Sequence, residues 1–346
     1  MKLNLHILGP RLLTVVLGLL LAAGTAEIGL RLIRFEYQLY PAQIQFGYPD
    51  PVTMQRLYQP DKDLFWVPHD YEARVTSNAG QRPSLVFMGC SCTQFGIYDR
   101  FVAENLRAQC PSNQLTFVNM GIGGWTTYQG LQQLKRDVLP MQPHIITIYY
   151  GWNDHWCTFG AEDLEIATFH LRHPILLNKT LSKLRVIQAV NKLLFSKVMS
   201  GKTYSQQRVP LADFRVNLRA MVRLARAHAI TPVLLTAPSS HQVGQEPAYL
   251  AERWLKDLHQ LVPLHNAYVQ AVRDVAAEEQ VDLVDLFTLF KALPPAELDA
   301  SFQRDGIHLT ETGDRHIAGF LGDYFAQHGL LPKLPAGAPA GAPSIP

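Results

Sequence analysis

The stretch Ser84-Leu-Val-Phe-Met-Gly-Cys-Ser-Cys-Thr-Gln-Phe-Gly96 carries the strongest fold signal in the chain. Its apolar start is typical of a buried parallel strand, and the small residues that follow allow the backbone to turn sharply into a helix. Such a turn places Ser91 at the carboxyl end of the strand and at the amino end of the next helix, where free N–H groups favour negative charge. Ser91 is therefore a candidate nucleophile, although a serine at such a turn more commonly caps the helix.

Strand-like runs alternate with helical patterns from residue 84 onward. The runs cover 84–88, 115–118, 144–150, 232–237 and 281–284, and the helical patterns include 99–109, 127–139, 212–229 and 263–279. This alternation implies right-handed crossovers and a parallel sheet with helices on both faces. We therefore expect an α/β fold, a three-layer α/β/α flavodoxin-like sandwich with a five-stranded parallel sheet.

In an open parallel sheet, a site is expected at the carboxyl ends of the strands. The second strand is followed by a glycine-rich loop at 119–127, and the third by Gly151-Trp-Asn-Asp154. Near the end of the chain, Arg304-Asp-Gly-Ile-His308 places a carboxylate and an imidazole three residues apart. A turn or a cap would explain each segment singly, but all of them fall at strand ends of one sheet, together with Ser91.

These segments together predict a serine hydrolase. Serine is a poor nucleophile at neutral pH, so it needs a base, and the base needs an orienting group. We expect Ser91 to be the nucleophile, His308 the general base and then acid, and Asp305 the group that holds the imidazole. The backbone N–H groups of Ser91 and Gly124 and the side-chain amide of Asn153 would form the oxyanion hole.

The motifs resemble those of the SGNH, or GDSL-like, hydrolase superfamily, whose four blocks are defined by Ser, Gly, Asn and His. The matching segments are Gly89–Thr93, Asn119–Gly124, Gly151–Asp154 and Asp305–His308, and the resemblance extends over residues 84 to 325. It implies ester hydrolysis or acyl transfer at acyl groups of carbohydrates or lipids, without a metal or an organic cofactor. Cys90 is a departure, because the family usually has Asp at this position.

An apolar segment near the amino terminus indicates export. If it ends at Ala26, it is typical of a secretory signal with a cleavage site at 24–26. If it continues through Leu32, it is long enough to cross a bilayer of about 30 Å at about 1.5 Å per residue. We favour an uncleaved anchor over residues 1–34, since the apolar pattern continues past the cleavage site. Glu27 and Arg31 have the helical spacing of an ion pair.

The flanking charges do not settle the orientation of this anchor, but the resemblance does suggest one. The arrangement is similar to that of bacterial exported family members that act on cell-surface polysaccharides. This similarity implies a single pass through the bacterial inner membrane, with the catalytic domain in the periplasm.

Composition argues against nucleic acid as a partner. The chain has 31 Lys and Arg against 29 Asp and Glu, a formal net charge of +2, and it has no basic block. The expected partners are the membrane, through the N-terminal helix, and an acylated glycan or lipid substrate. A membrane protein is a further candidate partner.

The rest of the chain falls into four segments by composition. Residues 35–83 predict an irregular membrane-proximal region with a small hairpin and no candidate chemistry. The α/β domain is expected over 84–330, and its insertion at 155–211 would form a lid over the site, or would place its amphipathic part on the membrane surface. The tail at 331–346 is of low complexity and is expected to be disordered.

The four cysteines leave two alternatives open. A disulfide from Cys157 to Cys90 or to Cys92 would join two site loops, while buried free thiols fit the sequence equally well, as they do for Cys110. A metal site is not expected, because no histidine pair at metal spacing accompanies the Cys-x-Cys motif. The insertion's histidines, which include His155, His170 and His173, more commonly have structural roles.

Three functions are compatible with these patterns. The first is an exported esterase that removes acetyl or other acyl groups from glycans or lipids. The second is an acyltransferase that uses the same triad and passes the acyl group to a sugar hydroxyl. The third is a catalytically weakened domain that serves as a structural or binding subunit of a membrane assembly, for which Cys90 gives some reason.

Overall fold

The computed structural model describes residues 5–37, 56–111, 114–158, 161–173, 180–199, 207–252 and 254–331. All but the first residue of the tail expected at 331–346 lies outside the described residues. The same holds for 38–55 of the membrane-proximal region and for 159–160, 174–179 and 200–206 of the insertion.

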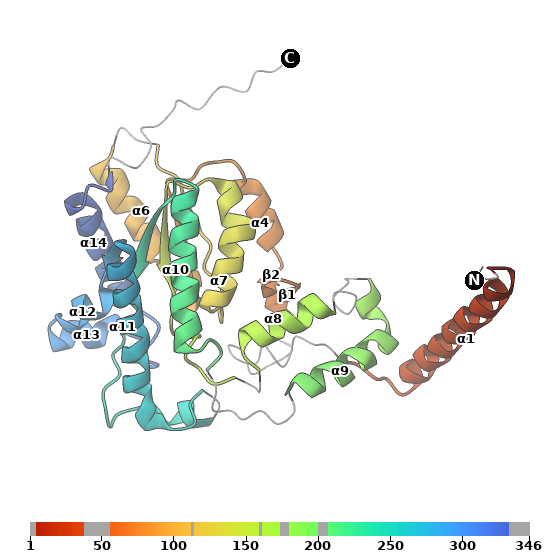
Figure 1. Cartoon of the computed structure of the whole chain (residues 1–346). Helices are drawn as coiled ribbons and strands as arrows, with labels where there is room; N and C mark the ends of the chain where they lie inside the picture. Colours follow the sequence, from red (N-terminus) through yellow and green to blue (C-terminus); the bar gives the residue numbers. More distant parts are fainter. Residues whose placement is uncertain are drawn as a thin grey trace, which may run out of the picture.

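A five-stranded parallel sheet forms the centre of the α/β domain (Figure 1). Its strands lie in the order β4-β3-β5-β6-β7, and all four neighbouring pairs are parallel. The strands are β3 (Leu85–Gly89), β4 (Phe117–Asn119), β5 (Ile145–Tyr149), β6 (Thr231–Leu235) and β7 (Asp282–Val284). In this order, β4 lies on one side of β3 and the later strands β5, β6 and β7 lie on the other side. This is the strand order of the flavodoxin-like fold. The predicted fold class is confirmed.

Helices cover both faces of the sheet, which explains why β3 and β5 are buried at every position and almost entirely apolar. α6 (Tyr98–Gln109) packs against α14 (Glu311–Gln327) on one face. On the other face, α10 (Leu211–Ala227) contacts both α7 (Thr127–Gln133) and α11 (Leu261–Glu279). The domain also contains the shorter helices α5 (Ser91–Gln94), α12 (Leu286–Lys291) and α13 (Pro295–Ser301) and the 3₁₀ turns Ala248–Glu252 and Leu258–Gln260.

The helix predicted over 127–139 is observed in three pieces. α7 continues into a π-helical turn (Leu134–Val138) and a 3₁₀ turn (Leu139–Met141). Pro140 has no N–H to donate to an α-helical hydrogen bond, so the helix cannot continue unchanged at this point. The last piece ends at Met141, two residues beyond the predicted end and shortly before β5.

The hairpin expected within 35–83 is present, and it belongs to the hydrophobic core. β1 (Tyr58–Asp61) and β2 (Phe65–Pro68) pair in antiparallel fashion, and α4 (Tyr71–Asn78) follows. Trp66 is only 1% exposed and packs with the same cluster as the central strands. The hairpin is therefore an integral part of the folded domain.

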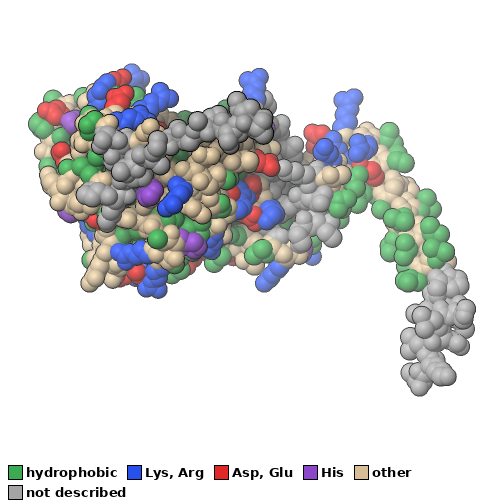
Figure 2. Space-filling view, turned by 90° about the horizontal axis from the view of Figure 1, so that it is seen from above, with side chains coloured by type: hydrophobic (Ala, Val, Ile, Leu, Met, Phe, Trp, Pro, Cys, Tyr) green, Lys and Arg blue, Asp and Glu red, His purple; other side chains and the backbone are tan. Residues whose placement is uncertain are grey.

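The amino terminus forms a long helix, α1 (Leu5–Leu32). Within the described residues, one helix is long and apolar enough to cross a membrane, and its apolar part is Leu12–Leu32, with a mean hydropathy of 1.9. A cleavable signal sequence would meet the same criteria. The ion pair between Glu27 and Arg31 is present at 2.7 Å. Figure 2 shows hydrophobic side chains around this projecting helix.

The insertion contains α8 (Asp163–Arg172), a 3₁₀ turn (Leu181–Lys183) and α9 (Arg185–Met199). In Figure 1, α8 and α9 lie between the α/β domain and α1. α9 contacts α1 directly, since the backbone N–H of Val186 donates to the Glu27 carboxylate at 2.9 Å. A lid over the site and a position on the membrane surface both stay predictions for this segment.

Candidate active site

Ser91 follows the carboxyl end of β3, and the last residue of this strand, Gly89, has no room for a side chain. A Cβ atom added to Gly89 would lie 2.8 Å from the carbonyl oxygen of Tyr149 and 2.1 Å from the hydroxyl of Thr93. The glycine therefore lets the chain turn tightly into α5. This helix is a single turn, so few aligned peptide dipoles contribute to the charge environment of Ser91.

The imidazole of His308 bridges Ser91 and Asp305. Its Nε2 atom is 2.8 Å from Ser91 Oγ, and its Nδ1 atom is 2.6 Å from Asp305 Oδ2. A proton on Nδ1, donated to the carboxylate, leaves Nε2 free to accept the serine proton. The structure thus brings together the three residues that the sequence predicted as a triad.

Backbone groups hold the Asp305 carboxylate independently of the imidazole. Its Oδ1 atom accepts the N–H groups of Ile307 and His308, each at 2.9 Å. On the other side of the loop, the Nε2 atom of His241 is 2.7 Å from the carbonyl oxygen of Asp305. The carboxylate is therefore fixed before any substrate arrives, and with it the direction of the imidazole.

The pKa values of this pair move in opposite directions. Burial alone would lower the pKa of His308, but the Asp305 carboxylate outweighs burial and raises it above its usual value. Burial would raise the pKa of Asp305, but the His308 imidazole and the two backbone N–H groups lower it overall. Both shifts favour an imidazolium beside a carboxylate, which is the charge state formed when the imidazole takes a proton from serine.

The glycine-rich loop after β4 lies against α5. Asn119 donates its side-chain amide to the carbonyl of Thr93 at 2.8 Å, and a Cβ atom on Gly121 would lie 2.6 Å from Thr93 Cβ. Further along, Gly124 has a φ of +77°, a backbone conformation that favours glycine. The first part of the loop, through Asn119 and Gly121, therefore packs against the turn that carries Ser91.

Asn153 is buried, and its side chain points to the same loop. Its Nδ2 atom donates to the carbonyl of Trp125 at 3.0 Å. An amide nitrogen has two hydrogens, so this bond leaves the second one for another acceptor. Asp154, the next residue, accepts bonds from the N–H and the hydroxyl of Thr127, and burial raises the pKa of Asp154 to about 7.

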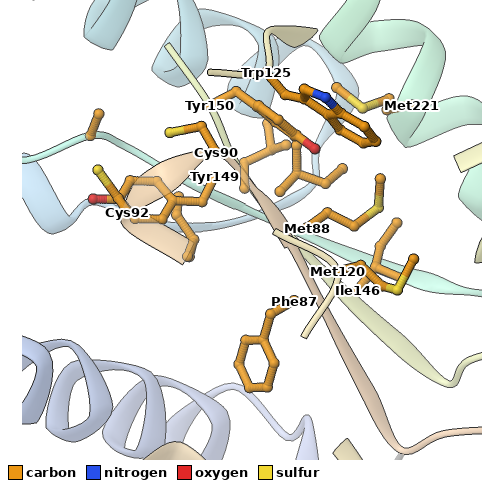
Figure 3. Packing of buried hydrophobic residues seen from close by; sticks show 14 of the residues in the cluster. Phe87, Met88, Cys90, Cys92, Met120, Trp125, Ile146, Tyr149, Tyr150 and Met221 are labelled. Atoms are coloured by element: carbon orange, nitrogen blue, oxygen red, sulfur yellow. The ribbon is translucent and has the colours of Figure 1, made fainter. Parts of the chain in front are cut away.

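All four cysteines, Cys90, Cys92, Cys110 and Cys157, lie in the described part of the chain and are free thiols. The disulfide alternative is therefore not observed. Figure 3 shows Cys90 and Cys92 in the core near Tyr149 and Tyr150, and Cys92 Sγ lies 3.9 Å from the carbonyl oxygen of Ile307. The contact between Cys90 and Cys92 lowers the pKa of the first thiol and raises that of the second.

The histidines of the insertion show no metal-binding arrangement in the described segments. No group of three His, Cys, Asp or Glu side chains there could hold a metal ion. His155 is fully buried, with its Nε2 atom 3.2 Å from Nδ1 of His265, and burial lowers the pKa of His155 well below its usual value. The ring of Trp152 stacks on His265 at 3.9 Å between centroids. His155 is thus a core residue.

Sequence reasoning missed three side chains that contact the glycine-rich loop at 119–127. They are Trp66 from the hairpin, Asp163 from the start of α8, and Arg208 from the end of the insertion. An aromatic cluster was visible at 63–68, but nothing in the sequence indicated what it would contact. Asp163 and Arg208 lie in the insertion at 155–211, whose sequence did not indicate which loop they would contact.

Residues 84–316 match the GDSL-like lipase/acylhydrolase family. The chain belongs to this family. As a GDSL-like hydrolase, it is an enzyme of the serine hydrolase class, and the four motif blocks all fall within the matched residues. No curated protein matches the sequence significantly.

Solved structures of similar fold include other GDSL-like hydrolases. A lipase/acylhydrolase from Enterococcus faecalis is 17% identical, with a TM-score of 0.45 over 71% of this chain and 96% of that one. A GDSL-like lipase from Bacteroides thetaiotaomicron is 18% identical, with a TM-score of 0.46 over 75% and 98%. An acetylxylan esterase from Geobacillus stearothermophilus is 20% identical, with a TM-score of 0.44 over 71% and 95%. Identities this low do not transfer a substrate to this GDSL-like hydrolase.

Proposed function

We propose that this GDSL-like hydrolase is an exported, membrane-anchored serine esterase that removes acyl groups, chiefly acetyl, from glycans or lipids. The observation that carries the proposal is the imidazole of His308, which lies within hydrogen-bond distance of both Ser91 and Asp305. A serine activated in this way attacks ester carbonyl groups.

In the proposed reaction, Ser91 Oγ attacks the ester carbonyl while His308 Nε2 takes the hydroxyl proton. The carbonyl oxygen becomes an oxyanion, which the N–H groups of Ser91 and Gly124 and the amide of Asn153 stabilise. The imidazolium then protonates the leaving alcohol, and an acyl-serine remains. Water, deprotonated by the same imidazole, releases the acid and restores the serine.

An exposed aromatic ring beside the nucleophile supports a glycan or lipid substrate. Phe95 is 57% exposed and follows Ser91 by one helical turn, its N–H bonded to the Ser91 carbonyl at 2.9 Å. Residues four apart share one face of a helical turn. The ring therefore offers an apolar surface to the C–H face of a sugar or to an acyl chain next to the reacting ester.

The proposal is tested with the full chain purified in detergent. A fluorophosphonate probe should label the protein, and acetate should be released from p-nitrophenyl acetate and from an O-acetylated oligosaccharide. The Ser91→Ala variant should lose both signals. As a matched control, Ser84→Ala removes a buried hydroxyl at the opposite end of the same strand and should keep both.

The same assay separates the competing functions. An acyltransferase would acetylate an added oligosaccharide acceptor, seen as a mass increase, while releasing little acetate into water. A structural subunit would give no label and no turnover with or without reductant, and this result would contradict the proposed esterase.

The proposed location is the bacterial inner membrane, with the α/β domain in the periplasm. It is supported by the length and apolarity of Leu12–Leu32 and by the continuation of α1 through Ala26. Alkaline phosphatase fused to the carboxyl terminus should be active, because this reporter folds only after export. An inactive fusion, or a protein released in soluble form after processing at 24–26, would contradict this topology or the retained anchor, respectively.

A further inference from the structure

In the glycine-rich loop at 119–127, two successive backbone carbonyl groups accept hydrogen bonds from side chains that lie outside the four motif blocks. The next carbonyl, that of Trp125, is the one bonded to Asn153. The carbonyl of Gly123 accepts a hydrogen bond from the indole Nε1 of Trp66 at 3.2 Å. The carbonyl of Gly124 accepts one from Nη1 of Arg208 at 2.6 Å. The donors come from the hairpin and from the end of the insertion, so two segments remote in sequence meet at one loop.

The bond from Trp66 fixes the direction of the Gly124 N–H group. The carbonyl of Gly123 and the N–H of Gly124 belong to one planar trans peptide, in which the two groups point in opposite directions. A donor that holds the carbonyl on one side therefore aims the N–H to the other side. The ring also supports the loop, since a Cβ atom on Gly124 would lie 3.1 Å from Trp66 Cζ2.

Arg208 fixes the next peptide and is itself held in place. It is 1% exposed, and its guanidinium forms two bonds to the Asp163 carboxylate, with Nε at 3.2 Å from Oδ1 and Nη2 at 3.0 Å from Oδ2. Asp163 in turn accepts the hydroxyl of Thr126 at 2.7 Å. The guanidinium carbon lies 5.7 Å from the centre of the Trp66 ring. Asp163 and Arg208, from the two ends of the insertion, thus both bond to this loop.

A buried ion pair is a poor device for stability, because apolar residues of similar size would serve as well or better. A guanidinium, however, presents several donors in a fixed plane, and here they reach the loop carbonyl, Asp163 and the side-chain oxygen of Gln129 together. This geometry orients a backbone segment, which an apolar replacement would not do.

We propose that Trp66 and Arg208 are positioning residues that hold the two peptides on either side of Gly124, so that its N–H group is aimed at the oxyanion. The hairpin and both ends of the insertion are then parts of the active site. This inference rests on the proposed esterase function, since it assigns a role in the oxyanion hole to residues that do not touch the substrate.

The most sensitive test is Trp66→Phe, which keeps an aromatic ring and removes the one N–H group that bonds to Gly123. We expect kcat to fall by at least about tenfold, toward the roughly 10²–10³-fold loss seen when an oxyanion donor is removed, with KM within about twofold of the wild type. Arg208→Lys keeps the charge and should retain more of kcat than Arg208→Met. The Ser84→Ala control should leave kcat unchanged.

A second measurement does not depend on turnover. Hydrogen exchange of the loop amides over residues 120–127 should be faster in Trp66→Phe and Arg208→Met than in the wild type, and unchanged in Ser84→Ala. Wild-type kcat and wild-type exchange in Trp66→Phe would overturn the inference, as would a rise in KM with kcat unchanged. A wild-type protein that no fluorophosphonate labels would instead contradict the esterase function, and the exchange measurement would still decide whether these side chains hold the loop.

Discussion

The Nε2 atom of His308 lies 2.8 Å from Oγ of Ser91, although 217 positions separate the two residues in the chain. Ser91 directly follows β3, whereas α12 and α13 lead the chain from β7 to the loop before α14, which carries His308. The other imidazole nitrogen is bonded to Asp305 at 2.6 Å. The chemistry of the site therefore depends on which protonation state this imidazole holds.

The first prediction concerns the pH dependence of that imidazole. Asp305 raises the pKa of His308 above its usual value. Because only the neutral imidazole can accept the serine proton, kcat/KM in the wild type should fall as the pH falls through this raised pKa. In Asp305→Asn, the burial that lowers the pKa of His308 remains, while the carboxylate charge that raises it is lost. The acidic limb of the profile should therefore move to lower pH. The maximal kcat should fall by about 10⁴-fold, as expected when the imidazole loses its orienting carboxylate.

The pH profile of ester hydrolysis for the two proteins checks this prediction. Asp285→Asn is a matched control, since Asp285 is also bonded to a cation, Arg273, and to a nearby backbone N–H. It should leave the acidic limb where it is. An acidic limb that stays in place in Asp305→Asn would show that another group titrates.

The second prediction concerns Asn153. Replacement by Ala removes the amide proposed for the oxyanion and also the bond to the Trp125 carbonyl. We expect kcat/KM to fall because the activation barrier rises by about 2.7–4 kcal/mol, as for the loss of one oxyanion donor. Asn217→Ala, which removes an amide bonded to the neighbouring Thr127 hydroxyl at 3.2 Å, should have a much smaller effect. Equal losses in the two variants would remove Asn153 from the oxyanion hole.

The central sheet could be predicted from sequence because its signal is local. β3 and β5 are apolar at nearly every position, β3 ends in Gly89, and Gly151 follows β5 by two residues, so each run marks a buried parallel strand without knowledge of its neighbours. The candidate nucleophile followed from the same information, because parallel strands present their carboxyl ends on one edge. Contrary to the prediction from sequence, Asp305 and His308 do not follow a strand directly, since α12 and α13 lie between β7 and this segment. Short spacing also placed Asp305 beside His308.

Contacts between remote segments could not be predicted in this way. Nothing local in 63–68 shows that the Trp66 indole reaches Gly123, which lies 57 positions later. Arg208 and Asp163 are separated by 45 positions, and their pairing depends on how the insertion folds back on itself. Side-chain partners of this kind are set by tertiary packing, whereas strand and turn patterns are set by neighbouring residues.

A third prediction follows from the four free thiols. Without reductant, the denatured protein should show four reactive cysteines in a thiol-counting assay. In the native protein, the partly exposed Cys110 should react first, because Cys90, Cys92 and Cys157 are buried. Reductant should not change the esterase rate. Two reactive thiols after denaturation, rising to four with reductant, would show that an exported chain forms a disulfide that the structure lacks.

The last prediction separates stability from positioning at the buried pair of Arg208 and Asp163. Asp163→Leu leaves the guanidinium buried without its counter-ion, which should cost about 3–5 kcal/mol. At about 2–4 °C per kcal/mol for a domain of this size, Tm should fall by roughly 6–20 °C. Adding Arg208→Met removes the unpaired charge, so the double variant should recover most of this loss.

The double variant should nevertheless stay slow, because nothing then holds the Gly124 carbonyl. Thermal melts of the detergent-solubilised chain, read beside kcat, give both quantities for each variant. Glu311→Gln breaks an exposed pair with Arg315 on α14 and should change Tm little, since such pairs contribute at most about 1 kcal/mol. If the double variant recovered kcat together with Tm, the ion pair would serve stability alone, and the loop would keep its geometry without Arg208.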